Sequence, residues 1–301
     1  MRGCRLRLPA TSANLGPGFD ALALALSFYL EIEAEESDEF VIDVSGRNRE
    51  LCSAVKNNLL LDTYTEILQT NNAPVVPVKV RMVNGIPLGM GCGSSAATRL
   101  AGVALASHFG GLKWERERIL TVASLLEGHP DNTAACWHGG LSVACWHGKE
   151  VEAISITPGA RWKAIIAMPA RPLPTRESRA VLPESYSRAD AVANLQHVAL
   201  LTAAFAQGRG DLLHSATQDW MHQPYRERVC PLLPLLAPLA GRDGLLSVTL
   251  SGAGPSILLL VDADADMLSV RQLIDSAAGE SEPVELIECT IESAPAVYES
   301  L

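Results

Sequence analysis

Residues 89–93 alternate glycine with other residues, and two serines and two alanines follow them. The stretch reads Gly-Met-Gly-Cys-Gly-Ser-Ser-Ala-Ala and comes directly after Ile86-Pro87-Leu88. Glycine adopts backbone dihedrals that other residues avoid, and it has no side chain to keep a ligand away. Where such a loop opens into a helix, unpaired backbone N–H groups point outward at the positive end of the helix dipole. The stretch therefore predicts an anion site, most naturally for phosphate.

Other interpretations of the same stretch stay open at this point. The common phosphate loop ends in Gly-Lys-Ser or Gly-Lys-Thr, and this one has no lysine. A dinucleotide-binding loop needs the spacing Gly-x-Gly-x-x-Gly, whereas the spacing here is Gly-x-Gly-x-Gly. A glycine-rich turn that only starts a helix, capped by serine, also fits these residues.

Composition narrows the classes of protein. With 301 residues the chain is long enough for one large domain or two ordinary ones. The hydrophobic fraction of 48% excludes a disordered protein and supplies a buried core. The net charge is −10 and no basic stretch is present, so neither nucleic acid nor an anionic membrane surface is an expected partner.

The sequence favours a cytoplasmic location. No apolar run reaches the roughly 18–20 residues of a membrane-spanning helix, and the first residues lack the apolar stretch of a secretory signal. The seven cysteines are scattered without a Cys-x-x-Cys pair, which favours free thiols in a reducing compartment. Metal binding by His129, His138 and His147 with Cys136 and Cys145 is a weak alternative, because the spacing matches no common zinc finger.

Hydrophobic patterning predicts a mixture of strands and helices. Strands are expected over residues 3–9, 75–83, 141–146, 151–157, 163–168, 247–250, 257–261 and 283–289. Helices are expected over residues 58–69, 94–109, 114–127, 189–207, 211–221 and 266–278. The alternating runs 29–35 and 39–44, separated by Ser37-Asp38, favour a hairpin. Mixed elements in two halves predict an α+β protein with two domains, residues 1–155 and residues 156–301.

Two further motifs accompany the glycine-rich stretch. One is Pro9-Ala10-Thr11-Ser12-Ala13-Asn14-Leu15-Gly16-Pro17-Gly18-Phe19-Asp20, and the other is Ser251-Gly252-Ala253-Gly254-Pro255-Ser256. With three motifs in this order, essentially the whole chain resembles the GHMP kinase superfamily of galactokinase, homoserine kinase, mevalonate kinase and phosphomevalonate kinase. Within that superfamily, the form of the first motif is similar to that of the homoserine kinases. The stretch Glu127-Gly128-His129-Pro130-Asp131-Asn132, followed by Gly139-Gly140, is similar to theirs as well.

The resemblance implies a fold and an activity. The fold is a nucleotide-binding α+β domain over residues 1–155 and a ferredoxin-like domain over residues 156–301. The activity is phosphorylation of the hydroxyl of L-homoserine by ATP with Mg²⁺, a step toward threonine. Relatives are often dimers, so a homodimer is the implied assembly. The alternatives are a kinase of the same superfamily for another small alcohol, and a catalytically inactive nucleotide-binding sensor.

The resemblance also implies which residues bind ATP and the metal. Ser95, with Ser94 as a further candidate, and Glu127 match the Mg²⁺ ligands, and magnesium favours such hard oxygen donors. A solvated carboxylate at a helix end is the alternative role for Glu127. Asn58 matches a position near adenine, but asparagine before an apolar helix is commonly an N-cap, so both roles stay open. The remaining residues expected at the ATP site are Pro87, Leu88, Gly89, Met90, Gly91, Cys92, Gly93, Ser94, Ser95, Ala96 and Ala97.

An amino-acid substrate needs cations for its carboxylate and carboxylates for its ammonium group. Arg179 and Arg226 match the family pattern, and the guanidinium fork suits a carboxylate; surface arginines are the alternative. Asp20 and Asp131 are candidates for the ammonium and hydroxyl ends, and a structural salt bridge is their alternative role. Residues expected near the reacting hydroxyl are Asn14, Asp20 and Asn132, and those expected to bind substrate are Asp131, Thr175, Arg179, Arg226 and Gly254.

Asp131-Asn132 stands where the homoserine kinases show Asp-Asn, so we expect no dedicated strong base. Phosphoryl transfer passes through a loose transition state, and its catalysis depends mostly on positioning and charge stabilisation. An oxygen of the γ-phosphate would then take the hydroxyl proton late. The chain departs from the family pattern at Cys92, where leucine is usual, and at Thr98-Arg99. Arg99 lies one turn into the helix and is predicted to lean toward phosphate or solvent.

Overall fold

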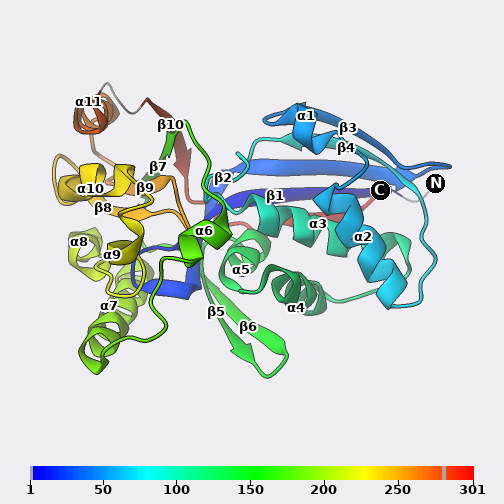
Figure 1. Cartoon of the computed structure of the whole chain (residues 1–301), viewed down its shortest axis with the longest axis horizontal. Coiled ribbons are helices and arrows are strands. Elements are labelled where there is room, and N and C mark those ends of the chain that lie inside the picture. The colour runs from blue at the N-terminus through cyan, green and yellow to red at the C-terminus, as the bar shows by residue number, and fades with distance from the viewer. Residues whose placement is uncertain (1–2, 280–282) are drawn as a thin grey trace.

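The computed structural model describes residues 3–279 and 283–301 of the chain. Two β-sheets lie toward opposite ends of an elongated molecule, with helices packed on them (Figure 1). In the described residues the first sheet has seven strands, with β11-β1-β2-β4-β3 as its main order and β5 and β6 attached through β2. Its strands are β1 Gly3–Asn14, β2 Gly18–Glu36, β3 Val41–Gly46, β4 Val78–Asn84, β5 Leu141–His147, β6 Glu150–Ile156 and β11 Val297–Ser300.

The long strand β2 has different neighbours along its two halves. It pairs with β4 from Leu30 to Glu36 and with β5 from Leu22 to Leu24. The predicted hairpin between 29–35 and 39–44 is wrong, because β4 lies between the two strands and β3 pairs with β4 in parallel. Alternate residues of β4 are buried, which fits a central strand with one face on the core.

Four helices cover one face of the first sheet (Figure 1). They are α2 Leu59–Thr70, α3 Ser94–Phe109, α4 Arg116–Glu127 and α5 Asp131–His138, and the short α1 Arg49–Cys52 lies near β3. Helix α3 has the bounds that the sequence predicts, whereas α5 was not predicted. Its eight residues follow a turn with glycine and proline, and they are too few to display a clear helical period.

The second sheet has the strand order β10-β7-β9-β8. Its strands are β7 Lys163–Pro169, β8 Leu245–Leu250, β9 Ile257–Val261 and β10 Val284–Thr290. Ile165 packs with helices α10 Leu232–Leu236 and α11 Met267–Ala278. Its neighbour Ile166 packs on the opposite face, in one core with α7 Arg188–Gln207 and the first sheet. The two sheets therefore share a core, and the short elements α6 Thr175–Arg179, η1 Gly210–Leu212, α8 Leu213–Ala216, α9 Gln223–Arg226 and η2 Ala237–Leu239 complete this half.

The predicted helix 211–221 is wrong beyond Ala216. The carboxylate of Asp219 accepts hydrogen bonds from the backbone N–H groups of Met221, His222 and Gln223. These bonds replace the bonds of a continuing helix, and α9 starts anew after His222.

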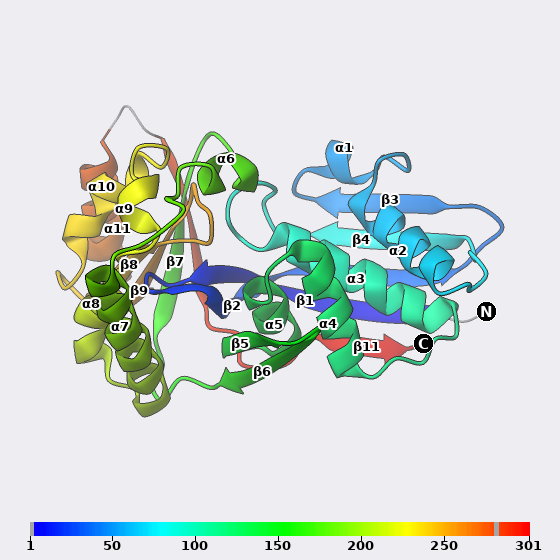
Figure 2. The ribbon, with the colours of Figure 1, turned by 60° about the horizontal axis from the view of Figure 1, so that its bottom comes forward.

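The chain ends in the first sheet rather than the second. After β10, strand β11 lies beside β1 (Figure 2), and the two pair antiparallel. Leu6 of β1 lies opposite Tyr298 of β11. The α+β class is confirmed, and the boundary between residues 155 and 156 stays a prediction. Within the described ranges, no helix has the length and apolar character to cross a membrane.

Candidate active site

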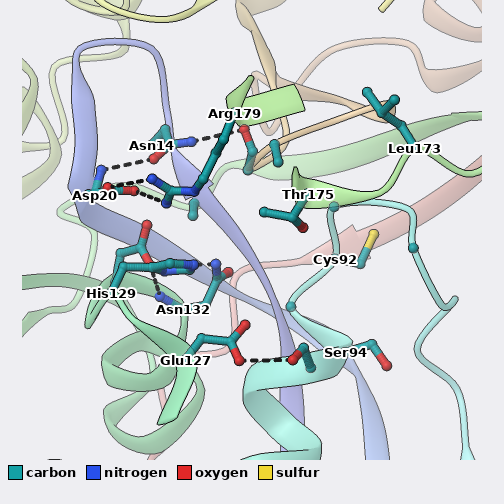
Figure 3. A pocket seen from close by; sticks show the side chains of 18 of the residues that line it. Asn14, Asp20, Cys92, Ser94, Glu127, His129, Asn132, Leu173, Thr175 and Arg179 are labelled. Carbon is teal, nitrogen blue, oxygen red and sulfur yellow. Dashed lines mark hydrogen bonds and ion pairs between the residues drawn. The ribbon is translucent and has the colours of Figure 1, made fainter. Parts of the chain in front are cut away.

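The three glycine-containing motifs meet at one pocket where the two sheets adjoin. Backbone and side-chain bonds tie them together: Thr11 N donates to the Cys92 carbonyl at 3.1 Å, and Ser251 Oγ donates to the Gly91 carbonyl at 2.7 Å. The pocket is lined by Ala13, Asn14, Asp20, Pro87, Gly89, Gly91, Cys92, Gly93, Ser94, Ser95, Glu127, His129, Asp131, Asn132, Leu173, Thr175, Arg179, Arg226, Gly252 and Ala253 (Figure 3).

The glycine-rich loop needs glycine at every second position. Gly89, Gly91 and Gly93 have φ of 68°, 73° and 71°, in the left-handed region. A Cβ on Gly91 would lie 2.2 Å from the Ser251 carbonyl oxygen, and one on Gly93 would lie 1.9 Å from Thr11 Oγ1. Glycine at residues 89, 91 and 93 therefore allows the backbone path by which the loop packs against the other two motifs.

Helix α3 starts directly from this loop, and its first turn faces the pocket. Gly93 is its N-cap, no side chain of the described chain caps it, and its first turn holds no acidic residue. Ser94 and Ser95 line the pocket. The unpaired N–H groups of the first turn and the helix dipole are thus available to an anionic ligand.

A second pocket adjoins the loop and shares Gly89, Ser94 and Ser95 with the first. Apolar side chains dominate its other residues, which are Leu30, Leu51, Cys52, Asn57, Asn58, Leu59, Leu60, Met82, Asn84, Leu88 and Thr98. Its position beside the anion site fits the base and sugar of a nucleotide whose phosphates lie on the loop.

Asn58 lies in this second pocket, but its side-chain amide is fully used by the chain. Its oxygen accepts from Leu60 N and Leu61 N as the N-cap of α2, and its nitrogen donates to the carbonyls of Cys52 and Ala54, both at 2.9 Å. An amide offers two donor hydrogens and two acceptor lone pairs. The two N-cap bonds and the two donor bonds together account for the whole bonding capacity of the Asn58 side chain.

The two predicted metal ligands lie in contact. Ser95 Oγ donates to Glu127 Oε2 at 2.8 Å. Arg99 Nε lies 3.0 Å from the same Oε2, so Arg99 pairs with Glu127 rather than leaning toward a phosphate or solvent. A hydroxyl and a carboxylate beside an anion site are hard oxygen donors, so the residues fit Mg²⁺.

The opposite wall carries the two predicted arginines. Arg179 forms a two-pronged ion pair with Asp20, with Nη1–Oδ2 at 3.0 Å and Nη2–Oδ1 at 2.6 Å (Figure 3). Arg226 is buried, with 1% of its surface exposed. Both guanidinium groups lie over the ring of Phe19, at 5.5 Å and 5.4 Å from its centroid. The predicted carboxylate-binding groups thus face the loop across one pocket.

Asn14 holds the first motif, residues 9–20, against the third motif, residues 251–256. Its Nδ2 donates to the Gly252 carbonyl at 2.9 Å, and its Oδ1 accepts from Asp20 N at 3.1 Å. Asn14 and Asp20 both have positive φ, of 74° and 55°. Strained backbone of this kind concentrates at functional sites.

The start of α5 supplies the remaining polar groups. Thr11 Oγ1 donates to Asn132 Oδ1 at 2.6 Å, and His129 Nδ1 lies 2.5 Å from Asp131 Oδ1. Burial alone would lower the pKa of His129, but the Asp131 carboxylate outweighs it, with smaller contributions from Asp20 and Glu127, and the net shift is upward. His129, Asp131 and Asp20 each offer one atom that could bind a metal ion, and these three atoms lie within 4.8 Å of one another.

Several residues that were predicted at the site do not line this pocket. The third motif lines the pocket with Gly252 and Ala253, whereas a Cβ on Gly254 would point at Cys230 Sγ, 2.7 Å away. Ala96 and Ala97 are buried. Met90 lines a separate hollow behind the loop.

Comparison with known proteins decides the family. A family model described as the N-terminal domain of GHMP kinases matches residues 58–140. A homoserine kinase of Solibacter usitatus is 42% identical over 275 residues, which cover 90% of this chain and 88% of that protein. A homoserine kinase of Synechocystis is 37% identical over 259 residues, covering 85% of each chain. The chain belongs to the homoserine kinase family.

The fold agrees with a solved member of that family. The crystal structure of homoserine kinase from Cytophaga hutchinsonii superposes with a TM-score of 0.81 at 25% identity, covering 99% of this chain and 97% of that one. Sequence reasoning did not assign five of the lining residues, Ala13, His129, Leu173, Gly252 and Ala253, and His129 is the one titratable group among them. The signal was present, because His129 lies inside the same stretch of residues 127–132 that carries the likeness to the homoserine kinases.

Proposed function

We propose that the protein transfers the γ-phosphoryl group of ATP to the hydroxyl of L-homoserine, forming O-phospho-L-homoserine on the way to threonine. One observation carries the proposal: Arg179 and Arg226 line the same pocket as Gly93, Ser94 and Ser95 at the N-terminal end of α3. An α-carboxylate held by the arginines would place a side-chain hydroxyl toward the loop. Membership of the homoserine kinase family supports the same substrate.

The nucleotide would lie across both pockets. The second pocket offers apolar surface for the base, and the loop offers the backbone N–H groups of α3 for the phosphates. Ser95 and Glu127 would hold Mg²⁺, which supplies positive charge to the phosphate oxygens when bound. Backbone donors and the metal together would replace the missing lysine.

The substrate-side groups would exchange partners when homoserine binds. Arg226 and Arg179 would take the substrate carboxylate, and Asp20, freed from Arg179, would take the ammonium group. Asn132 and Asp131 lie at the start of α5, beside His129, and would orient the hydroxyl end. The ion pair between Arg179 and Asp20 therefore keeps both charges compensated in the ligand-free pocket.

The transfer itself would need no strong base. The hydroxyl oxygen forms a bond to the γ-phosphorus while the bond to the leaving oxygen of ADP breaks. The proton of the hydroxyl passes late to an oxygen of the transferred group. The residues contribute by holding the hydroxyl in line and by stabilising the charge on the phosphate.

A coupled assay of ADP release tests this function. L-homoserine is compared with 4-hydroxybutyrate, which lacks the ammonium group, with 3-aminopropan-1-ol, which lacks the carboxylate, and with mevalonate. We expect turnover with L-homoserine and a large loss of kcat/KM with each of the others. Comparable turnover of mevalonate would indicate another alcohol as substrate, and ATP binding without turnover of any alcohol would indicate a sensor. A cytoplasmic location and a homodimer stay predictions.

A further inference from the structure

We propose that His222 is a positioning residue, which holds the Arg226 guanidinium ready for the substrate carboxylate by accepting a hydrogen bond from it. The inference deepens the proposed function and rests on it for the identity of the substrate. His222 lies one turn before Arg226, immediately ahead of α9. Its side chain is fully buried and contacts no solvent.

The two ring nitrogens of His222 have partners of opposite kind. Nε2 lies 2.8 Å from the Gly16 carbonyl oxygen, and Nδ1 lies 3.1 Å from Arg226 Nη1. A carbonyl oxygen only accepts, and a guanidinium only donates. Both bonds form together only if the ring is neutral, with its proton on Nε2 and its lone pair on Nδ1. Burial lowers the pKa of His222, and the charge of Arg226 adds to this against the opposing effect of Asp219, which fits a neutral ring.

The bond to His222 fixes one side of the guanidinium. Arg226 Nη1 also points at the Gly252 carbonyl at 3.3 Å, and Nε donates to the Ser178 carbonyl at 3.3 Å. Among the described residues none accepts from Nη2. Arg226 lines the substrate pocket, so Nη2 is the group left for a ligand. The shortest bond that holds this orientation is the one to His222.

The other side of the ring is anchored in the first motif. Gly16 has a φ of 80°, and a Cβ there would lie 2.1 Å from the Thr217 carbonyl oxygen. This position therefore requires glycine, and the backbone that carries the Gly16 carbonyl is packed directly against Thr217. The imidazole also stacks on Phe19, with centroids 5.3 Å apart and planes at 25°. His222 therefore contacts both the first motif and Arg226.

A matched pair of substitutions separates the two bonds. The amide of asparagine lies where the imidazole Nδ1 lies, so His222→Asn keeps an acceptor for Arg226 and loses the donor to Gly16. The amide of glutamine reaches the place of Nε2, so His222→Gln keeps the donor and loses the acceptor. Both remove the ring that stacks on Phe19, so the loss of packing is common to the two.

The readout is the KM for L-homoserine set against the KM for ATP. Because bonds to charged groups are the strong class, His222→Gln should raise the KM for L-homoserine by about tenfold or more and leave that for ATP unchanged. His222→Asn should stay within roughly threefold of the wild type. The control is His197→Asn on α7, where the ring contacts the Ala193 carbonyl and Trp220 instead of the pocket, and it should change neither KM.

Equal increases in both His222 variants, or none in either, overturn the inference. A wild-type protein that does not phosphorylate L-homoserine refutes the proposed function instead, so the two failures are distinguishable. NMR of the wild-type protein with ¹⁵N-labelled histidine tests the ring without relying on turnover or on a variant that folds. A neutral His222 ring with the proton on Nε2 is expected, and a proton on Nδ1 at neutral pH overturns the inference.

Discussion

Arg179 and Asp20 bind each other in the pocket where each was expected to bind an opposite end of the substrate. Their two bonds, at 3.0 Å and 2.6 Å, join α6 to the first motif. Both side chains are about one third exposed, so the pair is open to an incoming amino acid. A zwitterion offers one charge to each partner, and the exchange leaves no charge uncompensated.

Asp20→Asn should therefore affect substrate binding more than turnover. The variant loses the charge that would hold the substrate ammonium, and we expect the KM for L-homoserine to rise by about tenfold or more while kcat changes less. With 4-hydroxybutyrate, which has no ammonium group, the variant should lose little relative to the wild type. A large, pH-dependent loss of kcat would instead make Asp20 a base and contradict the mechanism without one.

Glu127→Gln should weaken metal binding. The change keeps the shape of the side chain and removes the charge that faces Ser95 and Arg99. Titration with Mn²⁺ in the presence of ADP, followed by electron paramagnetic resonance, should show affinity lower by about tenfold or more, since even outer-shell changes act on this scale. Glu117→Gln on the exposed side of α4 is the matched control. Equal Mn²⁺ affinity in both variants would exclude Glu127 as a ligand.

Gly93→Ala should damage the anion site, and Gly111→Ala should not. Both glycines have positive φ, of 71° and 65°. The new Cβ at residue 93 would meet Thr11 Oγ1 at 1.9 Å, whereas the one at residue 111 would meet nothing within 4 Å. Both variants should lose roughly 1–2 kcal/mol of stability from the left-handed backbone. Only Gly93→Ala should also weaken binding of an ATP analogue, which calorimetry measures; equal affinity in both would contradict the role of the loop.

The partly buried His129 and the fully buried His222 should make the free energy of unfolding depend on pH in opposite directions. The pKa of His129 is raised above its ordinary value of 6.5. Its protonation therefore stabilises the folded state fully below pH 6.5, and this stabilisation is lost as the pH rises through the folded-state pKa. The pKa of His222 is lowered from 6.5, so folding is opposed as pH falls below that value.

Urea unfolding between about pH 5 and about pH 9 measures both effects. His222→Asn should lose less stability than the wild type when the solution is acidified from neutral pH. His129→Asn should lose less than the wild type when the pH is raised above 6.5. Parallel curves for all three proteins would contradict both assignments.

Local chemistry made part of this structure predictable. The glycine-rich loop and helix α3 follow from a few adjacent residues, and the helix has the predicted bounds. The hairpin prediction failed because β4, which comes later in the chain, pairs between β2 and β3. The helix prediction over 211–221 failed because the side chain of Asp219 bonds to three backbone N–H groups of its own chain.

The partners of individual side chains were harder to predict than the pocket that they share. Glu127 and Arg99 come from different helices, and His222 and Gly16 come from opposite halves of the chain. Such contacts depend on tertiary packing, which periodicity does not report. Asn58 shows the converse, because its N-cap role is local and was one of the two interpretations available from sequence.

A crystal structure with a non-hydrolysable ATP analogue, Mg²⁺ and L-homoserine tests the central claim most directly. We predict the β- and γ-phosphates on the backbone N–H groups of residues 89–95, the metal between Ser95 and Glu127, and the homoserine carboxylate on Arg179 and Arg226. A triphosphate bound elsewhere, with residues 89–95 free of ligand, would contradict the account.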